Sequence, residues 1–171
     1  MTSPKERLRF EEVVKEHAGD LYRYAFWLVR DRHQAEDVVQ EALLRGWRAF
    51  PRLRDRAAVK TWLFAIVRNE FYRRIAKDVP YAASVDVAEL DIADERPGLF
   101  GLEMREALMA LPVSYSEPLA LQVLGGFSCA EIAAMLETTE GAVMTRLTRA
   151  RQTLRRLIAP GAAKERRGGR S

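Results

Sequence analysis

The chain has 171 residues, of which 48% are hydrophobic and 30% charged, and its formal net charge is +4. This composition excludes a disordered chain, and the length allows one or two small domains. The single cysteine, Cys129, excludes an internal disulfide and a multi-cysteine metal site, so we predict no metal and no cofactor. The first ten residues lack the apolar core of a signal peptide, and no apolar run approaches the roughly 20 residues that cross a bilayer. We therefore expect a cytoplasmic protein without membrane insertion.

Helical periodicity predicts a first block of three helices, and we assign residues 1–77 to this domain. The first helix carries Leu21, Tyr24, Ala25 and Leu28 at helical spacing. The second begins near residues 31–34 and ends before Pro51, because proline does not suit a helix interior. We expect a loop over residues 51–58 and a third helix over residues 59–76.

The chain between residues 78 and 101 lacks sustained periodicity and carries many acidic residues, so we predict an acidic, flexible linker there. A second helical domain follows over residues 102–160, with helices at 102–111, about 117–124, and 139–158. Gly125 and Gly126 end the middle of these helices, and Ser128 with Glu131 fits a capping box. Residues 161–171 form a basic tail that we predict to be disordered. The fold class is therefore all-α, with two small domains.

Basic residues gather in two blocks. Ten lie between Arg45 and Lys77, where only Asp55 and Glu70 oppose them, and five arginines lie between Gly141 and Ile158 without any acid. Two basic blocks separated by an acidic segment indicate two surfaces for a polyanion such as DNA. Two solvated helical faces would explain the same charge pattern.

One face of the second predicted helix combines acidic, polar and apolar residues. Asp37, Gln40, Glu41 and Leu44 stand at i, i+3, i+4 and i+7, and these positions share a face. Such a face suits docking of a basic protein surface. Simple solvation is the alternative, and the pattern alone favours it.

The third predicted helix mixes aromatic and basic residues. Aromatic rings can stack on unpaired bases while cations hold the backbone, and Asn69 can hydrogen-bond a base edge. The residues concerned are Lys60, Trp62, Phe64, Arg68, Asn69, Phe71, Tyr72, Arg73 and Arg74. Aromatic residues at helical spacing also build cores, so we expect Trp62 to be mainly structural with one exposed edge.

The segment from Ser128 to Leu157 has the layout of a helix-turn-helix. The last helix should bury Val143, Leu147, Ala150, Leu154 and Leu157, which leaves Thr145, Arg146, Thr148, Arg149 and Arg151 on other faces. Hydroxyls and guanidiniums can read base edges in the major groove, and the backbone N–H groups of residues 140–142 can face a phosphate. An ordinary helical hairpin with an arginine-rich face is the alternative.

Three segments together resemble regions two and four of the extracytoplasmic-function sigma factors, a class of the sigma-70 family. They are AEDVVQEALLRGW, KTWLFAIVRNEFYRR and SCAEIAAML with EGAVMTRLTRARQTLRRL. The resemblance spans residues 10–158 and implies an alternative RNA polymerase sigma factor that directs promoter-specific initiation, associated with the nucleoid when active. It also implies two surfaces of core polymerase as partners, the clamp coiled coil and the flap, together with promoter DNA and an anti-sigma factor that holds the chain inactive.

The resemblance implies roles for individual residues. For polymerase binding it implies Asp37, Gln40, Glu41 and Leu44. For the melted minus-ten element it implies Arg52, Arg54 and Arg56 in a base-capturing loop, and Lys60, Trp62, Arg68, Asn69 and Arg73 on the following helix. For minus-thirty-five bases it implies Thr145, Thr148 and Arg149, and for phosphates Arg146 and Arg151. The chain departs from the family at Glu137, where a glycine is usual, and at Met144, where a basic residue is common.

Three rival functions differ from this one. A DNA-binding regulator that never joins polymerase would explain the last helices but not the first block. A sigma mimic, which binds anti-sigma factors but not DNA, conflicts with the arginines at 146, 149 and 151. An enzyme needs a nucleophile with a base, or a metal, and His17 and His33 are isolated in the sequence, so we predict no enzymatic activity.

Overall fold

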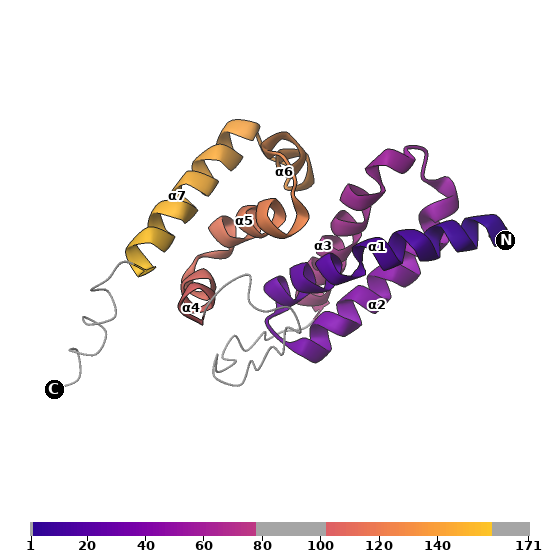
Figure 1. Ribbon diagram of the computed structural model, residues 1–171, viewed down its shortest axis with the longest axis horizontal. Coiled ribbons are helices and arrows are strands. Elements are labelled where there is room, and N and C mark those ends of the chain that lie inside the picture. Colours follow the sequence, from indigo (N-terminus) through magenta and orange to yellow (C-terminus); the bar gives the residue numbers. More distant parts are fainter. Residues whose placement is uncertain (1, 78–101, 159–171) are drawn as a thin grey trace. The chain divides into compact units, whose positions relative to one another are not determined.

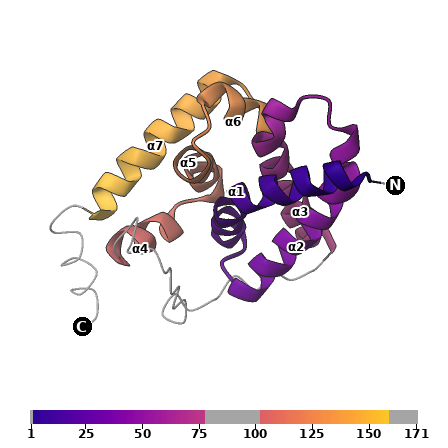
Figure 2. The same cartoon turned by 45° about the vertical axis from the view of Figure 1, so that its right-hand side comes forward.

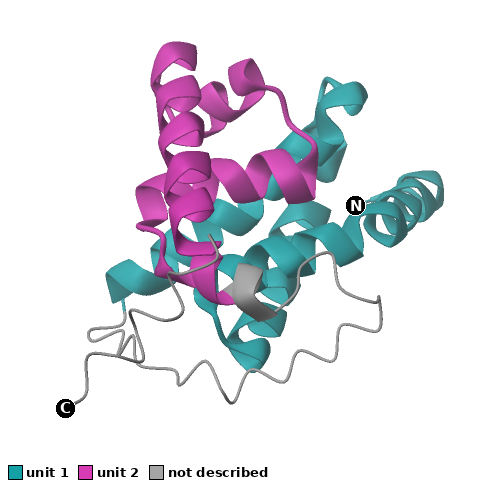
Figure 3. Cartoon of the chain, turned by 60° about the vertical axis from the view of Figure 1, so that its left-hand side comes forward, with its two compact units in different colours: residues 1–85 teal, residues 86–171 magenta. Residues whose placement is uncertain are grey.

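The computed structural model describes residues 2–77 and 102–158, and the predicted linker and tail lie outside these residues. The chain divides into two compact units, Met1–Val85 and Asp86–Ser171, and the division falls inside the predicted linker (Figure 3). We call them the first and the second unit. Every regular element in the described residues is helical, which agrees with the all-α prediction.

The first unit is built from three helices that pack on one another (Figure 1). They are α1 (Pro4–Val29), α2 (Arg32–Ala49) and α3 (Val59–Lys77), and two short 3-10 turns, η1 (Phe50–Arg52) and η2 (Arg56–Ala58), join α2 to α3. Phe10 fills the space between α1 and α2, with its ring centre 5.5 Å from that of Trp47 and 5.2 Å from that of Phe50. Tyr24 and Phe64 join α1 to α3, with ring centres 5.3 Å apart.

Helix α1 begins at Pro4, well before Leu21, the first residue named on its predicted apolar stripe. Ser3 caps it: the Ser3 hydroxyl accepts a hydrogen bond from the Glu6 N–H, and the Glu6 carboxylate accepts one from the Ser3 N–H. The hydrogen bond from the Ser3 backbone holds the pKa of Glu6 below its usual value. Pro4 at the first helical position fits this start, because its missing N–H would have no partner there.

The second unit contains α4 (Leu102–Ala110), α5 (Val113–Gly125), α6 (Cys129–Met135) and α7 (Glu140–Ile158), and α7 contacts the other three (Figure 2). The predicted stripe of α7 is buried at Val143, Leu147, Ala150 and Leu154, whereas Leu157 is half-buried. Helix α7 packs on α5 and α6, which contribute the core residues Leu121 and Ile132, and neither residue has exposed surface.

The predicted start of α5 near Glu117 was wrong, because the helix begins at Val113. Pro118 lies inside it, although an interior proline costs about 3 kcal/mol relative to alanine. The helix continues because Leu119, Ala120 and Leu121, directly after the proline, are buried.

Two glycines end α5 where the sequence indicated. Gly126 has a φ of 67°, which glycine adopts at little cost. A side chain on Gly125 would come within 2.4 Å of the Phe127 ring, so only glycine fits there.

Candidate polymerase and nucleic-acid interfaces

The predicted docking face lies on the solvent side of α2. Asp37, Gln40 and Leu44 are exposed, and Glu41 is half-buried. Leu44 is an exposed large apolar side chain at 52%. The buried residues of α2, such as Val38 and Ala42, occupy the opposite side of the helix. The structure therefore brings the four predicted residues together as an acidic and polar face that includes one exposed apolar side chain.

The turns between α2 and α3 hold three exposed arginines, Arg52, Arg54 and Arg56. The Arg56 guanidinium lies 4.0 Å from the centre of the Phe50 ring, a cation–π contact that fixes this side of the loop. The Asp55 carboxylate accepts a hydrogen bond from the Ala57 N–H at 3.0 Å and so begins η2. The segment is a pair of ordered turns with cations on its surface.

The five predicted residues of α3 divide into two groups. At about 100° per residue, Trp62, Asn69 and Arg73 fall on one stripe away from buried Leu63 and Val67. Asn69 and Arg73 are exposed on this stripe. Trp62 is half-buried, as predicted, with its ring centre 6.4 Å from that of Phe50.

Lys60 and Arg68 lie outside this stripe and are half-buried. The Arg68 guanidinium lies 4.6 Å from the centre of the Tyr72 ring. The two groups therefore lie on different sides of α3.

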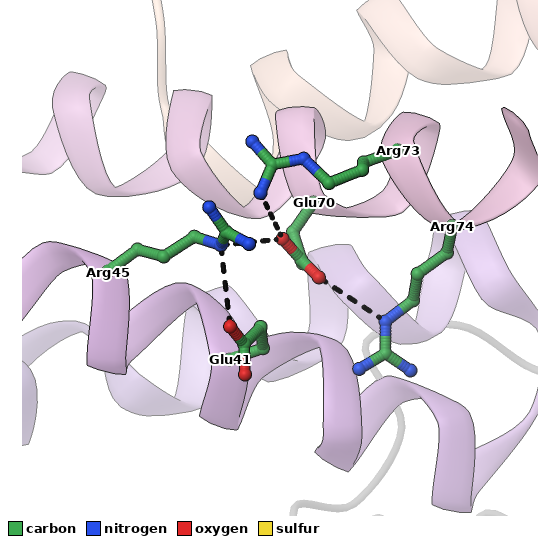
Figure 4. A network of polar contacts seen from close by, with 5 residues as sticks. All are labelled: Glu41, Arg45, Glu70, Arg73 and Arg74. Carbon is green, nitrogen blue, oxygen red and sulfur yellow. Dashed lines mark ion pairs between the residues drawn. The ribbon is translucent and has the colours of Figure 1, made fainter. Parts of the chain in front are cut away.

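Glu70 is a functional candidate that sequence reasoning missed, because it was counted only as one of two acids in a basic block. It is 5% exposed, on α3, and three arginines surround its carboxylate (Figure 4). Its partners are Arg45 from α2 at 3.0 Å, Arg73 at 3.5 Å and Arg74 at 3.5 Å. Arg45 also pairs with Glu41 at 3.5 Å. We call these five residues the Glu70 cluster.

The sequence contained part of the signal for this cluster. Arg73 and Arg74 follow Glu70 at i+3 and i+4, the spacing of helical ion pairs. The contact of Arg45 with Glu70 depends on the packing of α2 against α3, which local spacing does not contain.

On α7, the side opposite the buried stripe carries the residues predicted to face bases. Thr145, Thr148 and Arg149 are exposed there. Both threonine hydroxyls donate to carbonyls of their own helix, Thr145 to Gly141 at 3.0 Å and Thr148 to Met144 at 2.9 Å. Their methyl groups and oxygen lone pairs remain available for a ligand.

The two predicted phosphate contacts flank this side of α7. By helical spacing, Arg146 and Arg151 fall on opposite edges of it. Arg146 is half-buried, and Arg151 is exposed and donates a hydrogen bond to the Gln122 side chain of α5. Within the described residues no ion pair or hydrogen bond involves the side chains of Arg146 and Arg149.

The turn between α6 and α7 contains the departure at Glu137. Its φ is 52°, so a glutamate occupies a left-handed position that favours glycine. The Ser128 hydroxyl accepts a hydrogen bond from the Glu131 N–H and donates one to the Glu131 carboxylate, which is a variant of the predicted capping box.

The prediction that the N–H groups of residues 140–142 face a phosphate was wrong for one of them, Ala142. The Ala142 N–H donates to the Thr139 hydroxyl at 3.1 Å, so this capped group is not free for a phosphate.

Two general properties follow from the described residues. No three potential metal ligands among them come together, and no helix there is long and apolar enough to span a bilayer.

Comparison with known proteins decides the family. Residues 13–79 match the family Sigma-70 region 2, and residues 101–154 match the family Sigma-70, region 4. The ECF RNA polymerase sigma factor SigM of Mycobacterium tuberculosis is 34% identical over 156 residues, 90% of this chain and 79% of SigM. The chain belongs to the extracytoplasmic-function sigma factors. It is thus an alternative sigma factor of RNA polymerase, with region two in the first unit and region four in the second.

Other relatives of this sigma factor agree. SigL of M. tuberculosis is 37% identical over 150 residues, which are 84% of this chain and 85% of SigL. Among solved structures, the sigma factor RpoE of Bartonella quintana, in complex with the anti-sigma factor NepR, is 27% identical with a TM-score of 0.74. That match covers 90% of this chain and 98% of RpoE.

Proposed function

We propose that this sigma factor contacts promoter DNA at two separate elements while α2 holds it on core polymerase. The observation that carries the proposal is the exposed side of α7, where Thr145, Thr148 and Arg149 lie opposite the buried stripe of the helix. An exposed helix side with hydroxyls and guanidiniums suits the major groove, and we assign it to the minus-thirty-five element. Arg146 and Arg151 at its edges would bind phosphates and set the register.

The first unit would hold the melted minus-ten strand. We assign Trp62, Asn69 and Arg73 on one stripe of α3 to this strand, and the cations Arg52, Arg54 and Arg56 to the loop that captures a flipped base. Flipping costs a few kcal/mol of unstacking, so an ordered loop with cations is a suitable receiver. Lys60 and Arg68, outside the stripe, would attract the phosphate backbone from the sides.

Asp37, Gln40, Glu41 and Leu44 would dock on the clamp coiled coil of polymerase, and region four on the flap. An acidic face with an exposed leucine at one end suits a basic partner surface that also offers an apolar contact. The chain then supplies recognition and the polymerase supplies catalysis. In this role the protein works in the cytoplasm and associates with the nucleoid when it is active.

An anti-sigma factor is the second proposed partner. The similarity to RpoE of B. quintana, which was solved in complex with its anti-sigma factor, supports this proposal. We expect copurification from the native host to recover an antagonist with this chain. Recovery of polymerase alone from unstressed cells, together with constitutive activity, would contradict it.

Run-off transcription on host DNA with reconstituted holoenzyme, followed by mapping of start sites, tests the function. We expect starts that share two conserved elements upstream and that disappear when the sigma factor is left out. A chain that binds core polymerase yet directs no start would behave as a sigma mimic. A chain that binds promoter DNA but not core polymerase would be a plain regulator.

A further inference from the structure

The Glu70 cluster places a buried anion beneath cations that face solvent. The Glu70 side chain is 6% exposed, whereas the side chains of Arg45, Arg73 and Arg74 are 37–41% exposed. Each guanidinium has five N–H donors, so one contact with the carboxylate leaves others for a second ligand. Figure 4 shows the three arginines converging on the carboxylate from α2 and α3.

Stability alone does not account for a carboxylate at this position. Removing a carboxylate from water carries a cost that ion pairs often only offset, and an apolar residue of similar volume is often as stable. The contact between Arg45 and Glu70 is an ion pair without hydrogen-bond geometry, because neither Arg45 Nε nor Glu70 Oε2 has a hydrogen-bond partner within the described residues. Arg73 and Arg74 also form ion pairs with this carboxylate at 3.5 Å, and these contacts draw both guanidiniums toward it.

We propose that Glu70 is a positioning residue that orders Arg73 and Arg74 for hydrogen bonds to base edges of the melted minus-ten strand. This inference rests on the proposed function of α3. Long side chains lose rotamer freedom when they bind, and an anchor removes part of that loss beforehand. The sum of charges in the cluster is +1, from three arginines and two glutamates, so an anion can still be attracted to it.

Glu70 could position the arginines or only neutralise their charge, and these two roles predict opposite results for Glu70→Gln. This change keeps the shape of the side chain and makes the surface one unit more positive. If Glu70 only offset charge, holoenzyme would bind every single strand more tightly. If Glu70 positions the arginines, affinity for a matched minus-ten strand should fall about tenfold, the loss of one charge-assisted contact, while affinity for a scrambled strand should not fall.

The experiment measures binding of reconstituted holoenzyme to fluorescent single strands that carry the mapped minus-ten element or its scrambled version. Glu12→Gln, at an exposed position of α1, makes the same change of charge and should leave the ratio of the two affinities unaltered. Glu70→Asp retains the charge with a shorter reach and should recover part of the ratio. An unchanged or increased ratio for Glu70→Gln would overturn the proposal.

A second variant and melting curves distinguish a loss of positioning from a folding defect. Glu70→Leu fills the same space without charge, and we expect its melting temperature to stay close to that of the parent chain while the ratio still falls. If Glu70→Leu is folded and retains the full ratio, positioning is refuted. The proposed function fails differently: Arg73→Ala would then leave the matched strand as tightly bound as before.

Discussion

The two units present their arginines in different ways. In the first unit, Arg73 and Arg74 are held by Glu70, and Arg56 and Arg68 lie over aromatic rings. In the second unit, within the described residues, Arg146 and Arg149 on α7 have no hydrogen-bond or ion-pair partner, whereas Arg151 donates a hydrogen bond to Gln122. Anchored cations suit a flexible melted strand, which must be ordered by its receiver. Unanchored arginines suit a duplex, whose groove is already rigid and can order the side chains itself.

The largest expected effect is a loss of stability that is confined to one of the two units. Leu147 is 2% exposed in the core of the second unit, and Leu147→Ala should lower its stability by about 3–4 kcal/mol. All three tryptophans lie in the first unit, so tryptophan fluorescence follows that unit while circular dichroism follows both. We expect an early transition in circular dichroism and an unchanged fluorescence transition.

The matched variant is Leu63→Ala in α3, where the leucine is 1% exposed. It should shift the fluorescence transition instead. A common shift of both signals in either variant would show that the units unfold together, which contradicts their independence.

The next effect concerns the docking face of the first unit. Glu41→Lys should weaken binding to core polymerase by about 2–3 kcal/mol, because it brings like charges together on the face that we propose to bind a basic surface. Titration of labelled sigma factor with core enzyme measures this. Glu12→Lys, the same charge reversal on exposed α1, should bind normally, and equal affinity of both variants would refute the assignment of the face.

The arginines of α7 should divide by role. Arg149→Ala should cost about 1–3 kcal/mol on the matched minus-thirty-five element and little on other sequences. Arg146→Ala should weaken binding to all DNA sequences alike. It should also lower the slope of the logarithm of the affinity against the logarithm of the salt concentration by about one unit. Anisotropy titrations of holoenzyme at several salt concentrations measure both quantities, and identical profiles for the two variants would contradict the division.

A smaller effect compares one backbone position in each unit. Glu137 and Arg30 both have left-handed backbones, with φ of 52° and 60°. Glycine removes the strain of this conformation at some cost in the unfolded state, so Glu137→Gly should stabilise the second unit by up to about 1 kcal/mol. Arg30→Gly should do the same for the first unit only. Thermal melting followed by circular dichroism and by tryptophan fluorescence shows which unit gains stability in each variant. A loss of stability would show that other contacts of these side chains matter more.

The smallest expected effect concerns the contact between the methyl group of Thr145 on α7 and DNA. The Thr145 hydroxyl already donates to Gly141, so its methyl group is available for a thymine methyl. Replacing thymines of the minus-thirty-five element by uracil one at a time should cost about 0.5 kcal/mol at one position. Thr145→Ser should abolish that difference, and Thr145→Val should keep it. A serine variant with an undiminished preference for thymine would contradict this geometry.

Local sequence patterns predicted most of the helices because their signals are local. The buried stripe of α7 repeats at helical spacing, and Gly126 marks the end of α5. Ser3 and Glu6 formed an equally local signal for the start of α1, which periodicity alone overlooked. The predicted start of α5 was misplaced, because the helix begins at Val113 and continues through Pro118, and the residues that follow the proline are buried. The Glu70 cluster could not be predicted in full, since Arg45 reaches Glu70 only through tertiary packing.

Footprinting of reconstituted holoenzyme on one mapped promoter tests most directly whether the two units contact separate stretches of DNA. Hydroxyl radicals report the upstream contact, and permanganate reports the melted downstream strand. We expect Arg149→Ala to lose upstream protection while melting persists when the promoter is saturated, and Arg73→Ala to lose melting while upstream protection persists. Loss of both signals together in each variant, or of neither, would contradict the account.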